Sequence, residues 1–385
     1  MKREEVINDV IHLFPYSRVK QGEDVVLYGF GKVGKNYYRQ LKANNYCNIK
    51  YIVDQNWEKY QSEGYPVKSP EHLKDELDTK VVLALLKKSN QITELLALYG
   101  VDDSRVIHDD TFMCNPVYPD KTQTIETITM SRKEAEAFYG AQTYARLEKV
   151  RNLLKLGGVV DDRGYIRIGS PNDGGYVMVD DLEDRDKKIA YSFGINNDVS
   201  WDSDMGTRGY DIYMYDHTID CLPEERECFH FFRKGIADMP DYGSEFDTLE
   251  RYIRKNGHQD RNHMILKMDV EGAEWGFLNM VRQETLEQFD QIILELHFML
   301  DTSRINAIEV ALEKLTKSHR LAHVHANNYG SVLCVDGIVY PDTLEVTMVK
   351  RDTYSECPYA EELPSKYDSP CWREYPEIVL GKWNT

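Results

Sequence analysis

Several features that define common protein classes are missing from this sequence. Its seven cysteines are scattered and never form a CxxC pair, which argues against both a disulfide framework and a thiolate zinc site. The longest apolar runs, such as Val81–Leu86, are far too short to span a bilayer. The first residues, MKREEVINDVIHLF, mix acidic with apolar residues and do not have the composition of a signal peptide. We therefore expect a cytoplasmic protein that does not insert into membranes.

Positive charge is also in short supply. The chain has 47 lysines and arginines against 65 aspartates and glutamates, a formal net charge of −18. Phosphate backbones would repel such a chain, and no basic run offsets the excess, so nucleic acid is not an expected partner. The remaining composition, with 42% hydrophobic residues, is that of an ordinary globular protein. A length of 385 residues favours two domains and leaves open whether the chain forms a homo-oligomer.

A glycine-rich turn marks the first domain, which we place at residues 1–115. The buried strand DVVLY leads into the turn GFGKVG, a helix-like segment follows, and the strand IKYIVD ends on an acid. Glycines let a backbone approach a phosphate at a helix N-terminus, and an acid after the next strand holds ribose hydroxyls. The pattern predicts a Rossmann-like, doubly wound domain. Its nucleotide site would consist of Gly29, Gly31, Gly34 and Asp54.

This first domain has other interpretations. The glycines would serve packing alone if no ligand binds, and a nicotinamide-dependent oxidoreductase would need a catalytic dyad such as Tyr-x-x-x-Lys, which does not follow. The glycine turn, Ile52–Asp54, Gly64–Val67 and Val106–His108 form a further pattern. In these residues the domain resembles the nucleotide-sugar-binding N-terminal domains of bacterial sugar acyltransferases and similar modules appended to sugar methyltransferases. The resemblance implies a nucleotide or nucleotide-linked sugar as ligand.

Residues 116–158 are expected to connect the two domains. Prolines and threonines without a clear period in residues 113–130 predict a linker. Residues 131–156 predict one helix, which begins with a capping box formed by Ser131 and Glu134 and stops at Gly157 and Gly158. We expect this helix to pack one domain on the other.

Strands and helices alternate again over residues 159–385, which predicts a second parallel sheet. The strand IAYSFGI contains Gly194 near its end, and YDIYMYD ends at Asp216. A methyl donor that carries adenosine needs such a pair, because the glycine permits close approach and the carboxylate accepts two ribose hydroxyls. The third strand, CFHFFRKGIAD, places Asp238 where the adenine edge would lie.

Polar side chains gather at the ends of the later strands. The segment MILKMDVEGAEWGFL is a buried strand that ends at Asp269, at the edge where open α/β sheets bind ligands. The strand FDQIILELHF carries Glu295 and His297 on one face, and LAHVHANN carries His323 and His325 on one face. Glu271 and Glu274, between these strands, have a purely structural interpretation as acids in the first turn of a helix.

Two chemical roles remain open for this cluster. Asp269, Glu295 and His297 together offer the oxygen and imidazole ligands that hold a divalent cation such as Mg²⁺ or Mn²⁺. Alternatively, His297 or His325 acts as a general base on an acceptor hydroxyl. Each histidine taken singly also has a structural interpretation. The catalytic candidates are therefore Asp269, His297 and His325.

The stretch LKMDVEGAE (266–274) carries a further resemblance, supported by Tyr215-Asp216, LELH (294–297), the R-I-G…N-D-G-G-Y pattern of 167–176 and the tail prolines. In these residues the chain resembles the FkbM-type family of S-adenosylmethionine-dependent methyltransferases. The resemblance implies a class I methyltransferase fold and S-adenosylmethionine as cofactor. The first glycine motif, FGINNDVSWD, departs from the family pattern, so only Gly194 and Asn197 carry over. Further donor contacts are expected from Asp173, Gly174 and Tyr176.

The family implies an O-methyltransferase whose acceptor is a small molecule or a sugar. The glycine turn of the first domain adds the hypothesis that this acceptor is linked to a nucleotide. We therefore expect an enzyme of surface-polysaccharide or glycoconjugate biosynthesis. The alternative is a non-catalytic nucleotide-sensing or scaffold protein with a degenerate methyltransferase fold, which the departure in the first glycine motif permits.

Overall fold

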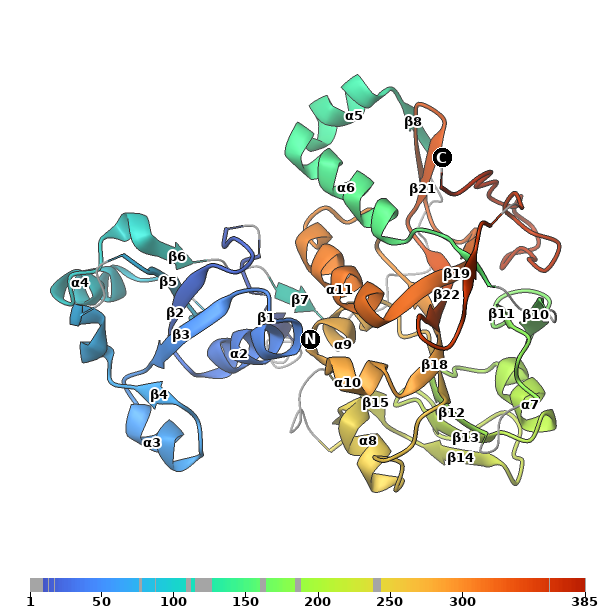
Figure 1. Ribbon diagram of the computed structural model, residues 1–385, viewed down its shortest axis with the longest axis horizontal. Coiled ribbons are helices and arrows are strands. Elements are labelled where there is room, and N and C mark those ends of the chain that lie inside the picture. Colours follow the sequence, from blue (N-terminus) through green and yellow to red (C-terminus); the bar gives the residue numbers. More distant parts are fainter. Residues whose placement is uncertain are drawn as a thin grey trace. The chain divides into compact units, whose positions relative to one another are not determined.

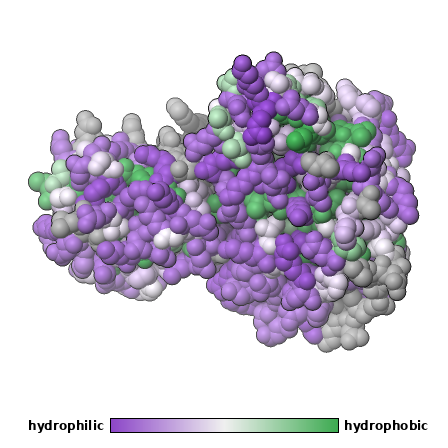
Figure 2. Space-filling model, turned by 45° about the horizontal axis from the view of Figure 1, so that its top comes forward, coloured by the Kyte–Doolittle hydropathy of each residue, from purple (hydrophilic) through white to green (hydrophobic). Residues whose placement is uncertain are grey.

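The computed structural model describes residues 10–12, 14–16, 18–75, 78–86, 88–108, 112–114, 127–159, 164–183, 188–237, 244–359 and 361–384. The chain divides into two compact units, residues 1–115 and 116–385, shown in Figure 1. Figure 2 shows mainly hydrophilic residues on the face turned to the reader, in keeping with the composition.

The first unit alternates short strands and helices. Its elements are β1 (Val10–His12), β2 (Asp24–Tyr28), α2 (Lys32–Asn44), β3 (Asn48–Val53), α3 (Trp57–Ser62), β4 (Val67–Lys68), the 3-10 helix η2 (Pro70–Asp75), β5 (Lys80–Leu83), α4 (Asn90–Leu98), the 3-10 helix η3 (Asp103–Arg105), β6 (Val106–His108) and β7 (Phe112–Cys114).

Five strands of this unit form a parallel sheet in the order β4-β3-β2-β5-β6, and β1 pairs separately with β7. The strands are parallel because a helix or a long connection returns the chain between them. The central strands β2 and β5 are almost entirely apolar and buried. The sheet therefore provides the core of the unit, and the turn after β2 lies at its carboxyl edge.

The second unit carries the larger sheet. Its elements are β8 (Thr127–Met130), α5 (Arg132–Tyr139), α6 (Ala141–Leu153), β9 (Gly158–Val159), β10 (Tyr165–Ile168), β11 (Tyr176–Val179), β12 (Ile189–Phe193), α7 (Ser200–Thr207), β13 (Asp211–Tyr215), β14 (Phe229–Phe232), β15 (Gly235–Ile236), β16 (Phe246–Asp247), α8 (Leu249–Lys255), β17 (Met264–Met268), α9 (Glu274–Met280), α10 (Gln283–Leu286), β18 (Phe289–Leu296), α11 (Ile305–Ser318), β19 (His319–Ala326), β20 (Val332–Val335), β21 (Ile338–Pro341), β22 (Leu344–Lys350) and β23 (Glu356–Cys357).

Seven strands follow the order β14-β13-β12-β17-β18-β22-β19. The first five run parallel, and β22 is antiparallel to both β18 and β19. Figure 1 shows α7 on the opposite side of this sheet from α9, α10 and α11. With helices on both faces, the central strands β12, β17 and β18 are buried along their whole length. The predicted mixed α/β chain with parallel sheets is confirmed.

The segment expected to connect two domains has a different structure. Residues 127–130 form β8, which pairs with β20, and the single helix predicted for residues 131–156 is two helices, α5 and α6. The break occurs at Gly140, whose backbone (φ 83°, ψ 139°) is not helical. The capping box of Ser131 and Glu134 is present. Because α6 packs against α11 of the same unit, this segment belongs to the second unit.

Candidate functional site

The first predicted donor residue, Gly194, lies where two strand ends meet. It follows β12 with a positive φ of 75°, and a Cβ at this position would lie 1.6 Å from the backbone oxygen of Asp269. Only glycine fits such a contact. The backbone at Gly194 therefore makes the predicted close approach, but to the end of β17.

Asp216, at the end of β13, fixes the loop that follows Gly194. Its Oδ2 accepts hydrogen bonds from the backbone N–H groups of Ile195 (2.9 Å) and Asn196 (2.8 Å). Its Oδ1 accepts from the N–H and the hydroxyl of Thr218, at 2.8 and 2.6 Å. Burial raises the pKa of Asp216, but these hydrogen bonds outweigh it, so the pKa is below its usual value. A carboxylate accepts about four hydrogen bonds, so a ribose hydroxyl would have to replace one of these donors.

The other predicted donor residues lie in different surroundings. Asn197 is exposed on the loop after β12, and Asp238 lies outside the described residues. Gly174 has a φ of 84°, and a Cβ there would lie 2.8 Å from Oδ2 of Asp198. The turn between β10 and β11 therefore packs on the loop after β12.

His297 follows β18 in a ring of carboxylates. Its Nδ1 lies 3.3 Å from Oε1 of Glu274, which also accepts the backbone N–H of His297 at 2.8 Å. Its Nε2 lies near three further carboxylate oxygens, those of Glu271 (3.5 Å), Glu295 (3.7 Å) and Asp269 (3.9 Å).

This environment favours the protonated form of His297. Burial lowers the pKa of His297, but the negative charges, that of Glu274 first, raise it well above its ordinary value. A protonated imidazole has no free lone pair, so it neither accepts a proton nor binds a metal. A cation bound by His297 would therefore have to replace its proton.

Tyr176, on β11, contacts two of the carboxylates that surround His297. Its hydroxyl lies 3.3 Å from Oδ2 of Asp269 and 3.5 Å from Oε2 of Glu295. The Asn327 amide donates to the second oxygen of Glu295 at 2.6 Å. Burial, together with the charge of Asp269, raises the pKa of Glu295 well above its usual value.

Asp173, in the turn before β11, extends the group of acids. The residue is exposed, and one of its carboxylate oxygens lies within 4.8 Å of carboxylate oxygens of Glu295 and Glu345. Loss of solvent, followed by the charges of Asp269 and Glu345, raises the pKa of Asp173 to about 7. Glu345, on β22, pairs directly with Glu295 in the sheet. The sequence analysis did not single out Glu345, because its place depends on the register of β22.

Two sets of side chains could hold a divalent cation here. The ligand atoms of Asp269, Glu295 and His297 lie within 4.8 Å of one another, and those of Asp173, Glu295 and Glu345 do as well. Hard cations such as Mg²⁺ and Mn²⁺ prefer such carboxylate oxygens. The residues predicted as ligands therefore come together in a way that suits this chemistry.

His325 has different partners from His297. Its Nδ1 lies 2.7 Å from Oε2 of Glu345, and its Nε2 makes a very short contact with Glu377. Burial lowers the pKa of His325, but the hydrogen bonds to Glu345 and Glu377 and the charge of Glu345 together outweigh burial and raise the pKa to about 10. With both ring nitrogens engaged, His325 has no free lone pair to act as the general base predicted for it.

In the first unit, the glycines of the turn have unequal roles. Gly29 has a φ of 100°, and a Cβ on Gly34 would lie 2.1 Å from the backbone oxygen of Gly29. A Cβ on Gly31 would meet nothing within 4 Å. Asp54 accepts the N–H of Phe30 at 2.7 Å, so the acid predicted to hold a ribose ties the turn to β3. Of these three glycines, only Gly31 has open space where a Cβ would lie.

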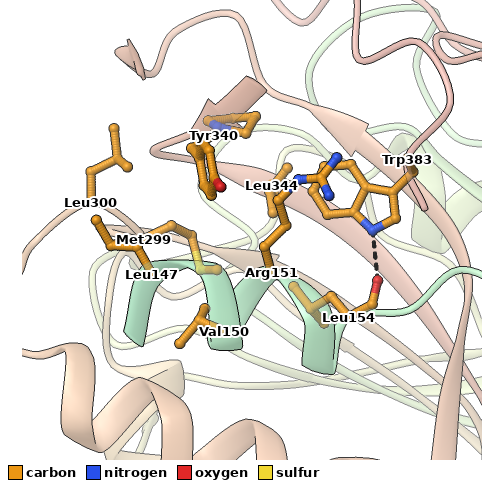
Figure 3. Close-up of a pocket in the computed structure, with 10 residues that line it drawn as sticks. Leu147, Val150, Arg151, Leu154, Met299, Leu300, Tyr340, Leu344 and Trp383 are labelled. Carbon is orange, nitrogen blue, oxygen red and sulfur yellow. Dashed lines mark hydrogen bonds between the residues drawn. The ribbon is translucent and has the colours of Figure 1, made fainter. Parts of the chain in front are cut away.

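A shallow apolar pocket, open to solvent, lies elsewhere in the second unit. Figure 3 shows α6 along one side and Trp383 at the end of the pocket, where the indole N–H donates to the oxygen of Leu154 at 2.6 Å. The Arg151 guanidinium stacks 4.5 Å from the Trp383 ring. The lining residues are Leu147, Val150, Arg151, Leu154, Met299, Leu300, Tyr340, Pro341, Leu344 and Trp383.

No protein-family model and no curated protein matches this chain. In the part of the chain that the structure describes, no helix is both long enough and apolar enough to cross a lipid bilayer. The function must therefore be inferred from the strands, loops and side chains described above.

Proposed function

We propose that the chain is an S-adenosylmethionine-dependent O-methyltransferase of the FkbM type. It would act on a sugar hydroxyl in surface-polysaccharide or glycoconjugate biosynthesis. The observation that carries the proposal is the order of the seven-stranded sheet, together with the polar residues at the carboxyl ends of its central strands. The order β14-β13-β12-β17-β18-β22-β19, with β22 alone antiparallel to its neighbours, is the arrangement expected of a class I methyltransferase fold.

The position of the polar residues supports this proposal. In an open α/β sheet, ligands bind beyond the carboxyl ends of the strands at the point where the strand order reverses. Here that point lies between β12 and β17, because the chain adds β13 and β14 on one side and β18 on the other. Gly194 and Asp269 follow these two strands directly. The methyl donor would lie over them, with the acceptor towards His297.

Different residues of the chain would then fix the loop and act on the acceptor. Glu274 accepts the N–H of Gly272 and that of His297, and so fixes the DVEG loop to the end of β18. Asp269 would take the proton of the acceptor hydroxyl as the methyl group is transferred, and the protonated His297 would orient that hydroxyl. A Mg²⁺ or Mn²⁺ ion held by Asp269, Glu295 and His297 would lower the pKa of that hydroxyl.

The first unit supports the second half of the proposal. Its parallel order β4-β3-β2-β5-β6, with a glycine turn at the end of the central strand, is compatible with a Rossmann-like nucleotide-binding domain. The open position at Gly31, at the start of α2, suits a phosphate. We propose that this unit holds the nucleotide portion of the acceptor.

A second candidate function is favoured by Gly194 and Asp216. Both make their close contacts within the protein, and the four acceptor positions of Asp216 are occupied. A chain in which this loop has lost its donor would be a non-catalytic nucleotide-sensing or scaffold protein. This candidate requires that S-adenosylhomocysteine does not bind.

The deciding experiment is calorimetric titration of S-adenosylhomocysteine into the folded protein, with Mg²⁺ and with EDTA. We expect one-to-one binding, weakened about tenfold or more by Asp216→Ala because that change releases the loop after β12. The matched control is Asp220→Ala, which alters an exposed acid after the same strand. His297→Ala should retain donor affinity and lower methyl transfer. Absence of binding to a folded wild-type chain would leave the non-catalytic candidate.

A further inference from the structure

Four side chains from three parts of the second unit converge beside the candidate site, at the side of β22 away from β18. His325 comes from β19, Glu345 from β22, and Cys371 and Glu377 from the C-terminal segment. Sγ of Cys371 lies 3.3 Å from Oε1 of Glu345, and Nδ1 of His325 lies 2.7 Å from Oε2 of the same residue. His325, Glu345 and Cys371 are all less than 5% exposed.

We propose that His325, Glu345 and Cys371 form a zinc site. The ligand atoms of the three residues lie within 4.8 Å of one another, so one ion can contact all of them. Imidazole nitrogen, thiolate sulfur and carboxylate oxygen together are the donor set of zinc, whereas Mg²⁺ avoids sulfur. A fourth position would be left for water. This proposal does not rest on the proposed methyltransferase function.

Glu377 has the place of an orienting residue. A histidine that binds a metal through one ring nitrogen usually donates its other N–H to a carboxylate, which fixes the ring. Here Nδ1 of His325 faces Glu345, and Nε2 contacts Oε1 of Glu377. The second oxygen of Glu377 is buried and has no hydrogen-bond partner among the described residues.

The charges around the site are compatible with zinc. Glu345 pairs directly with Glu295 across the sheet, and each of these two acids contacts a histidine, His325 for Glu345 and His297 for Glu295. Zinc binding would displace the protons of His325 and Cys371, so the ion replaces the positive charge that is lost and the net charge of the cluster does not change.

The scattered cysteines argued against a thiolate zinc site, and that argument holds for sites built from CxxC pairs. A single thiolate among nitrogen and oxygen donors needs no such spacing. The register of β19 and β22 brings His325 beside Glu345, and Cys371 joins them from the C-terminal segment. The sequence pattern therefore gave no signal for this site.

A zinc ion here would join the C-terminal segment to the sheet. Residues 361–384 contain no helix or strand and are held mainly by individual hydrogen bonds. The backbone oxygen of Cys371 accepts the N–H of Asp173, and Asn328 exchanges two hydrogen bonds with the backbone of Trp372. The ion would therefore also hold the wall of the candidate site that contains Asp173.

The test is metal analysis of the purified full chain, followed by chelation and titration with Zn²⁺ alone. We expect one zinc per chain, with protons released from both His325 and Cys371 as they bind the ion. In the Co²⁺-substituted protein, a sulfur-to-cobalt charge-transfer band should appear. Cys371→Ser should remove this band and weaken zinc binding at least 100-fold. The matched control, Cys357→Ser, changes another cysteine near the C-terminal segment and should leave both unchanged.

Further variants keep the proposal open to refutation if Cys371→Ser fails to fold. Glu377→Gln should weaken zinc binding 10- to 100-fold, as for other residues that orient a ligand. Zinc should also slow protease cleavage within residues 361–384. The proposal is wrong if the folded, metal-free wild type binds no zinc, or if Co²⁺ gives no thiolate band. It is equally wrong if His297→Ala removes binding while Cys371→Ser does not.

Discussion

A single buried lysine lowers the stability of the folded chain. Lys314, on α11, is 1% exposed, and its ammonium group donates to the backbone oxygen of Val281 at 2.7 Å. No carboxylate among the described residues forms an ion pair with it. Burial therefore lowers the pKa of Lys314 from 10.5 to about 7. Below pH 7 the folded chain must hold an unpaired charge away from water.

Replacing this lysine should stabilise the second unit. A shift of this size corresponds to roughly 5 kcal/mol, part of which is offset by loss of the hydrogen bond to Val281. Below pH 7 the buried charge lowers the free energy of unfolding of the wild type by its full amount. This free energy then rises as pH increases from 7 towards 10.5. Lys314→Met should therefore gain most at pH 6 and roughly 2–3 kcal/mol less at pH 9.

Urea unfolding at pH 6 and pH 9 measures this difference. Lys317→Met is the control, because Lys317 is exposed on the same helix and should change stability by less than about 0.5 kcal/mol. A gain that increases towards pH 9 would mean that burial of the charge is not the cause.

The two histidines show what the sequence could tell about the site. The sequence analysis expected His297 and His325 near strand ends and named both as candidate general bases, with His297 also as a metal ligand. The structure distinguishes them by their partners, which are Glu271, Glu274 and Glu295 for His297 and Glu345 and Glu377 for His325. These partners depend on side-chain packing and on the register of β22, which local periodicity does not encode.

At the scale of elements, two glycines at the junction of β2 and α2 have different roles. At Gly34 a Cβ would lie 2.1 Å from a backbone oxygen, and at Gly31 it would meet nothing. Gly34→Ala should destabilise the first unit by more than about 2 kcal/mol, because backbone has to move. Gly31→Ala should cost about 1 kcal/mol or less, as expected at a helix start.

Thermal unfolding followed with a probe in the first unit compares the two variants. If Gly31→Ala were the more harmful change, the turn would have a different geometry from that described. Titration of a nucleotide-linked sugar into the stable Gly31→Ala variant would further show whether the open position binds a ligand.

The elements that the sequence predicted well are the buried parallel strands. The predicted segments at residues 24–28, 189–195, 210–216, 264–268 and 289–298 correspond to β2, β12, β13, β17 and β18, because long apolar runs identify buried strands. The sequence analysis did not anticipate β8, β20 or β22. β8 is largely exposed, and the position of β22 between β18 and β19 is a property of the whole sheet.

At the scale of the whole molecule, negative charge is concentrated where the sheet ends. The chain has a net charge of −18, and Asp173, Asp269, Glu295 and Glu345 lie together in the second unit. Mg²⁺ or Mn²⁺ should therefore raise the melting temperature beyond the effect of ionic strength. A ligand at 100 times its Kd adds about 2.7 kcal/mol, which corresponds to roughly 5 °C for a unit of this size.

Thermal unfolding in MgCl₂ and in NaCl of equal ionic strength measures this effect. Asp269→Asn should remove the additional shift, whereas Asp220→Asn, at an exposed acid, should retain it. Equal melting temperatures in the two salts would mean that the acids bind no divalent ion.

The position of β22 also has a consequence for synthesis of the protein. β22 lies between β18 and β19, yet it is made after both, so a nascent chain cannot complete the larger sheet before residue 350 has left the ribosome. The five-stranded sheet of the first unit needs nothing beyond residue 108. At ordinary translation rates the interval is roughly 10 to 50 s. β18 and β19 are both complete only at residue 326, so the edges that await β22 stay unpaired for the last 24 residues of this interval, roughly 1 to 5 s. These edges are the sites where a chaperone would be needed.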